Sequence, residues 1–332
     1  MKSSKYQKRL LKFISPMMLT AILCVTSPGF AQVPNLSNSN KLIPLTKSTK
    51  SQIIAQNQSP LSIEQQARSH FSKGEFSQAV QLFQESVEKY AASGNTTRQA
   101  LSLSNLSLSY QKLGQWNNAE QSINKAVNLL EKTKNPTSQT DFVLAQAFDI
   151  QGGLQLARGQ ANPALESWKN ATDIYTKLNK PAQILTTSTN QAQALQNLGL
   201  YRRAITLLET ALKLPLNSTN ENTLLLKNHL QKISASPETT IALHTLGDSL
   251  RVVGNFSQAE IVLQQSLTAA KQLNLPDIVT LSQLGLGNTL RAQINQDKPG
   301  NNTINSQSAQ TALKYYQQAA TSESENFQVL SQ

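Results

Sequence analysis

The chain has 332 residues, only 15% of which are charged, and its formal net charge is +11. It contains one cysteine, Cys24, which excludes a framework of internal disulfides. The basic residues are scattered rather than clustered with aromatics, which is not typical of a nucleic-acid-binding protein. Phosphate-binding, dinucleotide-binding and calcium-binding sequence motifs are missing, so we expect no cofactor and no metal.

The first 31 residues have the pattern of a cleaved signal peptide. Five basic residues within 1–12 precede a mostly apolar run at 13–25, and Gly29-Phe30-Ala31 offers small residues at the cleavage positions. The alternative is an uncleaved anchor helix. A lipoprotein is not expected, because Leu23 is bulkier than the small residue that should precede the lipid-bearing cysteine. We therefore expect an exported protein, periplasmic or extracellular, with no membrane span after cleavage. Its net charge would be about 11 − 5 = +6.

Residues 32–59 are rich in Asn, Ser, Thr, Lys and Pro, with no apolar period, which predicts a disordered linker. After this linker, one short phrase recurs: Gly, any residue, an aromatic or small residue, two further residues, then Ala. It begins at Gly74, Gly114, Gly159, Gly199 and Gly254. Each copy separates two stretches with helical apolar spacing. A glycine can take the left-handed conformation that ends a helix, so each copy predicts the corner of a helix hairpin.

Six helix pairs are predicted in chain order, with one inserted helix at 222–233, one long loop at 295–306 and a disordered tail at 321–332. The pairs are 61–73 with 77–91, 97–113 with 117–131, 139–158 with 163–178, 182–198 with 202–214, 238–253 with 257–273, and 278–294 with 308–320. Paired helices that repeat along a chain predict an all-α fold, a right-handed α-solenoid that spans residues 60–320.

These repeats resemble the tetratricopeptide repeat (TPR), which places a small residue in the first helix opposite Ala and a bulky residue in the second. The small residues are Ala67, Ser107, Gly152, Ala192, Gly247 and Gly287. The alanines are Ala79, Ala119, Ala164, Ala204, Ala259 and Ala312, and the bulky residues four positions later are Phe83, Ile123, Trp168, Leu208, Leu263 and Tyr316. Successive alanines are 40, 45, 40, 55 and 53 residues apart. The usual repeat is about 34 residues, so this is a long-repeat type. Trp116 and Trp168 both fall at packing positions of the repeat.

The chain also looks like the repeat arm of exported bacterial proteins that carry a CHAT domain, a caspase-like peptidase. The phrase Leu246-Gly247-Asp248-Ser249-Leu250-Arg251, echoed from Leu286 to Arg291, carries this resemblance together with the signal segment. The CHAT domain itself is absent. It would need a His and Cys pair, and the mature chain has no cysteine.

Histidine is the residue type that most invites a catalytic or metal-binding interpretation. His70 falls where a packed side chain is expected, and His229 lies among the leucines of the inserted helix. His244 and Asp248 lie four residues apart on one helical face, as two metal ligands or an acid–base pair would. No third ligand and no nucleophile-elbow phrase accompany them, so we expect no enzymatic activity.

The remaining function class is a protein–protein interaction scaffold. In a solenoid of this kind the first helices line a concave groove, where Asn and Gln can bind the backbone of an extended peptide and Arg can pair with a carboxylate. The alternative is the recognition or regulatory arm of a CHAT protease whose catalytic domain is missing or encoded separately, and a further contact is possible at the uncapped C-terminal end. The candidate groove residues are Arg68, Asn105, Leu108, Asp149, Asn190, Gln193, His244, Asp248, Arg251, Asn288 and Arg291. For each of them, a merely solvated position is the competing interpretation.

Overall fold

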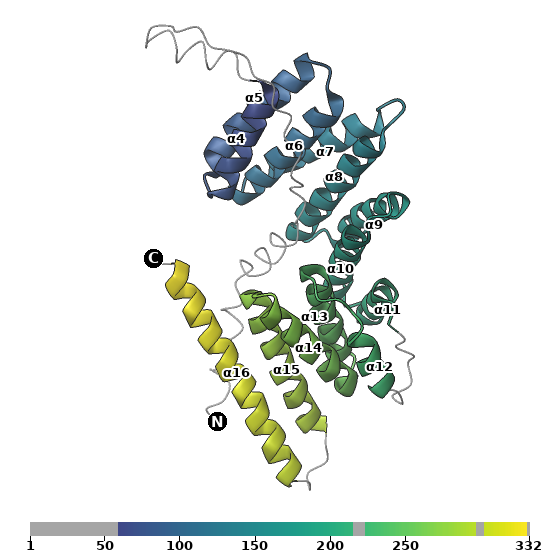
Figure 1. The fold of residues 1–332 in the computed structure, drawn as a ribbon, viewed down its shortest axis with the longest axis vertical. Helices are drawn as coiled ribbons and strands as arrows, with labels where there is room; N and C mark the ends of the chain where they lie inside the picture. The colour runs from purple at the N-terminus through teal and green to yellow at the C-terminus, as the bar shows by residue number, and fades with distance from the viewer. Residues whose placement is uncertain (1–58, 215–222, 297–301, 331–332) are drawn as a thin grey trace. The chain divides into compact units, whose positions relative to one another are not determined.

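The computed structural model describes residues 59–214, 223–296 and 302–330, and in this part of the chain it contains helices α4 to α16 and no strand (Figure 1). The all-α prediction is therefore confirmed. The predicted signal peptide, the linker up to residue 58, residues 215–222, and residues 297–301 of the predicted loop lie outside the described residues. The loop was predicted at 295–306, but residues 295–296 belong to α15 and 302–306 to α16.

The chain divides between Arg158 and Gly159 into two compact units. The division falls inside the third predicted pair. The first unit holds α4 (Pro60–Ser72), α5 (Phe76–Ala92), α6 (Thr96–Lys112), α7 (Trp116–Glu131) and α8 (Ser138–Ala157). The second holds α9 (Ala161–Lys177), α10 (Pro181–Asn197), α11 (Tyr201–Leu212), α12 (Thr223–Leu230), α13 (Pro237–Val252), α14 (Phe256–Gln272), α15 (Pro276–Gln296) and α16 (Asn302–Leu330).

The glycine of every recurring phrase has the left-handed backbone predicted for a hairpin corner. Their φ angles are 79° at Gly74, 70° at Gly114, 76° at Gly159, 73° at Gly199 and 89° at Gly254. Asn179 and Asn274 take the same conformation, at φ 52° and 53°, in turns between pairs. Asn tolerates the left-handed region better than most residues, so it ends these helices where no glycine is available.

The small, Ala and bulky positions of the repeat form the packed interior of each unit. Five of the six alanines are fully buried and Ala312 is nearly so, and the bulky residues Phe83, Ile123, Trp168, Leu208 and Leu263 are buried as well. The interpretation of Trp116 as a packing residue is wrong, because 38% of it is exposed. It is the first residue of α7, at the hairpin corner, where only one side of the ring can be covered.

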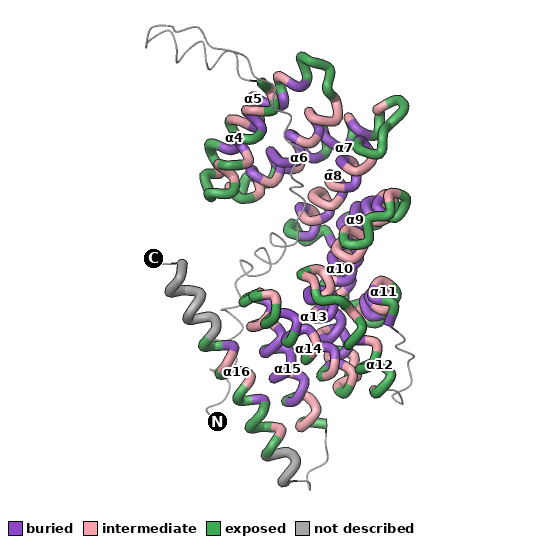
Figure 2. The backbone as a smooth tube through the Cα atoms, in the orientation of Figure 1, coloured by how far each residue is buried: buried purple, intermediate pink, exposed green. Residues whose placement is uncertain are grey.

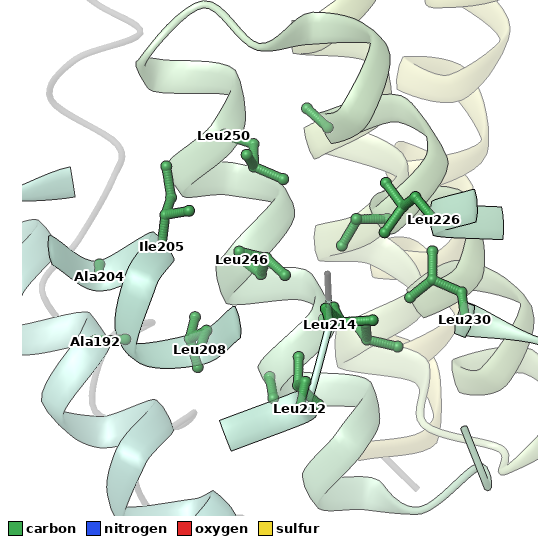
Figure 3. Packing of buried hydrophobic residues seen from close by; sticks show 14 of the residues in the cluster. Ala192, Ala204, Ile205, Leu208, Leu212, Leu214, Leu226, Leu230, Leu246 and Leu250 are labelled. Atoms are coloured by element: carbon green, nitrogen blue, oxygen red, sulfur yellow. The ribbon is translucent and has the colours of Figure 1, made fainter. Parts of the chain in front are cut away.

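The inserted helix α12 is anchored by its apolar side. Leu226 and Leu230 are buried in a cluster with Leu212, Leu214 and Leu246 (Figure 3). The helix is shorter than predicted, 223–230 instead of 222–233, because the chain turns directly after Leu230. The inserted helix is thus held to the second unit by leucine burial, at about 2 kcal/mol for each fully buried side chain.

The last helix, α16, is longer than the predicted 308–320 and covers residues that the sequence assigned to the tail. Residues 321–330 contain no Gly or Pro to end it. Among its side chains that the structure describes, Ala312 and Ala319 are buried, whereas Gln310, Lys314 and Gln317 are exposed (Figure 2). Leu313 is the large apolar side chain that is exposed on this outer side, where the residues just named are polar. The last helix of a repeat array faces solvent, and a polar outer side suits that position.

Candidate protein-binding surface

The candidate residues lie on the first helix of each pair: α4, α6 and α8 in the first unit, and α10, α13 and α15 in the second. Within each unit, we call the side of these helices that carries them the first-helix face. Within the first unit α6 packs on α8, and within the second α13 packs on both α10 and α15. The described structure therefore brings Arg68, Asn105, Leu108 and Asp149 onto one unit, and the other seven candidates onto the other.

Helix α6 positions its candidates because almost all of its surface is covered. Ser102, Ser104, Ser107 and Ser109 are buried, and their small side chains let the neighbouring helices approach. Each hydroxyl has a partner: Ser107, for example, donates to the carbonyl oxygen of Ala119 on α7 at 2.8 Å, and Ser109 donates to that of Asn105 at 2.9 Å.

Asn105 stands out on this helix because its amide lacks a partner. The residue is only 5% exposed, and its Nδ2 is buried without any hydrogen-bond acceptor. An unsatisfied buried donor of this kind destabilises a protein by about 1–3 kcal/mol. Asn105 therefore keeps a donor without an acceptor among the described residues, at a position where the sequence predicts contact with a peptide backbone, and neighbouring side chains cover it.

Arg68, by contrast, belongs to a charged network that the sequence analysis missed. Glu64 is 1% exposed and accepts hydrogen bonds from Arg68 at 2.5 Å, from Arg98 at 3.2 Å and from the Tyr90 hydroxyl at 2.9 Å. Burial, followed by the neighbouring Glu64 carboxylate, raises the pKa of Tyr90 above its usual range. The network ties α4 to α5 and α6. The spacing of Glu64 and Arg68, four residues apart on a predicted helix, was the available signal.

On α13, His244, Asp248 and Arg251 share one side of the helix, but His244 and Asp248, whose spacing would suit a pair, are not bonded to each other. Asp248 instead accepts two hydrogen bonds from Arg251, at 3.0 Å from Nε and 2.5 Å from Nη2. The imidazole Nδ1 of His244 is buried without a partner. Burial lowers the pKa of His244, Asp248 partly opposes this shift, and Arg251 adds to it. The imidazole is therefore held in its neutral form.

The neighbouring first helices supply the other candidates of the second unit. Asn190 is buried and Gln193 is half-buried on α10. On α15, Asn288 accepts a hydrogen bond from the Tyr316 hydroxyl at 2.9 Å, and Arg291 is exposed. Gln196, which was not a candidate, links α10 to α13 by donating to the Thr245 carbonyl at 3.0 Å and to the Ser249 hydroxyl at 2.8 Å. Leu108 and Asp149, in the first unit, are half-buried.

Among the described residues, the histidines could take part in two arrangements, a triad or a metal-ligand cluster. His244 makes no hydrogen bond to Asp248, whereas a Ser-His-Asp triad needs a carboxylate on the imidazole. Groups of three or more His, Cys, Asp or Glu that could hold a metal ion are not found among these residues. His70 instead bonds to Glu75 at a hairpin corner, and His229 to the Leu225 carbonyl. None of the described helices is long and apolar enough to cross a bilayer.

Solved structures with the same arrangement of helices are numerous, although no family model and no curated protein matches the sequence. The apo form of RapI is 13% identical, with a TM-score of 0.57, over 81% of this chain and 99% of that one. A signal transduction ATPase from Pyrococcus horikoshii, described as having a tetratricopeptide repeat sensor, is 14% identical with a TM-score of 0.54, over 78% of this chain and 38% of that one.

A third structure was determined with a ligand. The Rap conjugation gene regulator of plasmid pLS20, in complex with the Phr* peptide, is 13% identical with a TM-score of 0.51, over 92% of this chain and 86% of that one. The fold is that of a TPR-like helical solenoid. At these identities the likeness establishes the fold alone.

Proposed function

We propose that this chain is a non-enzymatic scaffold that binds a peptide or protein partner on its first-helix face. The observation that carries the proposal is the Nδ2 atom of Asn105, a buried donor without an acceptor on the helix face where the repeat predicts ligand contact. Once the side chains that cover Nδ2 move aside, a carbonyl oxygen of an extended peptide would supply that acceptor and remove the penalty of about 1–3 kcal/mol.

The second unit supports the same proposal with a second atom. His244 Nδ1 is buried without a partner on α13, and a neutral imidazole can donate or accept according to its tautomer. The Rap regulator of plasmid pLS20, which is similar in fold, was solved in complex with a peptide, and this supports the proposal. We expect the partner to be recognised through the N–H and C=O groups of its backbone.

The test uses the mature chain, residues 32–332, and a displayed library of random peptides. Peptides selected on this protein are measured by calorimetry against Asn105→Ala, His244→Ala and the control Gln121→Ala, which changes an exposed amide of α7. We expect about a tenfold loss of affinity for at least one of the first two variants and none for the control. Selected peptides that bind all variants equally would refute the proposal, as would a failure to select any.

The site of action that we propose is the periplasm or the extracellular space, because residues 1–31 have the signal-peptide pattern. The measurement is the N-terminal residue of the protein recovered from the exported fraction. We expect Gln32. Recovery of the intact N-terminus from the membrane fraction would favour an anchor instead.

A narrower role as the recognition arm of a caspase-like CHAT peptidase has one observation in its favour, the phrase Leu246–Arg251 and its echo at Leu286–Arg291. Cys24 is the one cysteine of these 332 residues and lies in the signal segment, so the cysteine nucleophile of such a peptidase would lie outside them. Co-purification of such a peptidase with the wild-type chain, and its loss with the groove variants, would support this role. A scaffold that recovers only other partners would exclude it.

A further inference from the structure

The inserted helix α12 creates a second groove, on helices that do not contribute to the first-helix face. The hollow has a volume of about 520 Å³ and is open to solvent. Its residues come from α12, including Lys227 and Leu230, from Gln231 in the turn directly after it, and from α14, including Glu260, Gln264 and Gln265. Volumes of about 300–1,000 Å³ are typical of ligand sites.

The groove is held in place from both sides. Leu226 and Leu230 bury the apolar side of α12, and Lys227 on this helix and Gln231 directly after it line the wall that faces α14. Gln265 Nε2 donates a long hydrogen bond, 3.5 Å, to the Leu230 carbonyl at one end. The Gln264 side chain is oriented from α16, because its Oε1 accepts a hydrogen bond from Tyr315 at 3.0 Å.

Two opposite charges face this groove from its two walls without neutralising each other. Lys227 on α12 and Glu260 on α14 both line the hollow and both are exposed. Neither forms an ion pair with the other or with any residue that the structure describes, although other Lys and Arg residues of the chain do pair with acids. The groove thus presents a separated positive and negative site above a floor that includes Leu230 and Ile261.

The amides that line the groove together with these charges complement a peptide backbone. Gln231, Gln264 and Gln265 each carry both a donor and an acceptor, as every peptide unit does. A uniformly charged polymer such as a nucleic acid would meet Glu260 as a repulsive group. An extended chain with one acidic and one basic side chain would satisfy both walls at once.

We propose that the groove between α12 and α14 is a second peptide-binding site, which takes an extended partner segment with an acidic residue at Lys227 and a basic residue at Glu260. The site is independent of the first-helix face, since α14 is a second helix and α12 lies outside the repeat. The chain would then hold two segments of partner protein on different surfaces.

The probes are short fluorescent peptides of Ser and Ala that contain one Asp and one Arg, synthesised in both orders and at several separations. Binding is measured by fluorescence anisotropy at low salt. The variants are Lys227→Glu, Glu260→Lys and the double exchange, all at exposed positions, where a change of charge leaves folding intact. Lys271→Glu, at an exposed site of α14 outside the groove, is the matched control.

We expect the wild-type protein to prefer one order of Asp and Arg. Each single variant should weaken that peptide about tenfold, and the double variant should prefer the reverse order. Lys271→Glu and Asn105→Ala should bind as the wild type does, which separates this site from the first-helix face. The proposal is overturned if no peptide binds, if the single variants bind unchanged, or if the double variant keeps the original order.

Discussion

Gly247 on α13 lies directly against Leu263 on α14. A Cβ atom at position 247 would stand 2.6 Å from Leu263 Cγ and 2.9 Å from its Cδ2, closer than carbon atoms approach in proteins. The same relationship recurs one pair later, where a Cβ at Gly287 would stand 2.9 Å from Tyr316 Cε1. The small residue of the first helix and the bulky residue of the second are therefore one packing unit, in which each limits the size of the other.

Replacing Gly247 by Ala should destabilise the second unit. Overpacking costs about 1–3 kcal/mol, while the better helix propensity of Ala returns about 1 kcal/mol, so a net loss of about 1 kcal/mol is expected. Urea unfolding followed by circular dichroism measures this change. A Gly247→Ala variant as stable as the wild type would show that Leu263 moves aside freely.

Replacing Gly153 by Ala, in the first unit, should have the opposite effect on stability. Gly153 lies within α8, and a Cβ there would have no atom within 4 Å. Gly153→Ala should therefore stabilise the protein by about 0.5–1 kcal/mol, because it only restricts the unfolded chain and improves helix propensity. A loss of stability in the same urea assay would contradict the interpretation of α8 as open at this point.

The sequence was sufficient for the helix pairs because their signals are local. A left-handed glycine at Gly74 or Gly254 ends a helix by its own backbone freedom, and the apolar period fixes the side that is buried. Trp116 was misjudged because its exposure depends on how far a neighbouring helix covers the corner, which no local pattern records.

The interaction surface was harder to predict because polar side chains choose their partners in three dimensions. Arg251 was interpreted as free to bind a carboxylate, yet it is bonded to Asp248, and Asn288 is bonded to Tyr316. The α12–α14 groove was not predicted at all. It depends on how Leu226 and Leu230 seat the inserted helix, which the spacing of leucines suggests but does not fix.

Glu64→Gln should loosen α4. The substitution keeps the shape of the side chain but removes the charge that Arg68, Arg98 and Tyr90 surround, so we expect a loss of about 2 kcal/mol and faster amide hydrogen exchange in α4. Glu85→Gln is the matched control, because Glu85 pairs with Lys89 at 3.6 Å between partly exposed side chains. The control should change stability by no more than about 0.5 kcal/mol. Equal effects of the two variants would rule out a structural role for the network.

Tyr90→Phe should be less stable than the wild type near neutral pH, because Glu64 loses a hydrogen bond, and the difference should shrink in alkali. The pKa of Tyr90 is raised in the folded state from its ordinary value of 10.0, so the protonated phenol is favoured by folding. This contribution is fully present below pH 10 and is lost as the pH rises through the raised pKa. Urea titrations of both proteins from about pH 8 to about pH 11 measure the gap. A constant gap would show that Tyr90 ionises as freely in the fold as in the unfolded chain.

His244→Gln should make the second unit less sensitive to acid. Burial lowers the pKa of His244 in the folded state from its ordinary value of 6.5, and Arg251 adds to the shift while Asp248 opposes it. The unfolded chain therefore binds a proton below pH 6.5 that the folded chain resists, and wild-type stability is present above that pH and lost as the pH falls. The slope reaches about 1.4 kcal/mol for each pH unit and each proton. Urea titrations between about pH 7 and about pH 5 should show the wild type losing more stability than the His244→Gln variant, because glutamine does not titrate. Parallel curves would mean that the imidazole is solvated enough to accept a proton in the fold, and its orphaned Nδ1 would then no longer support a ligand on α13.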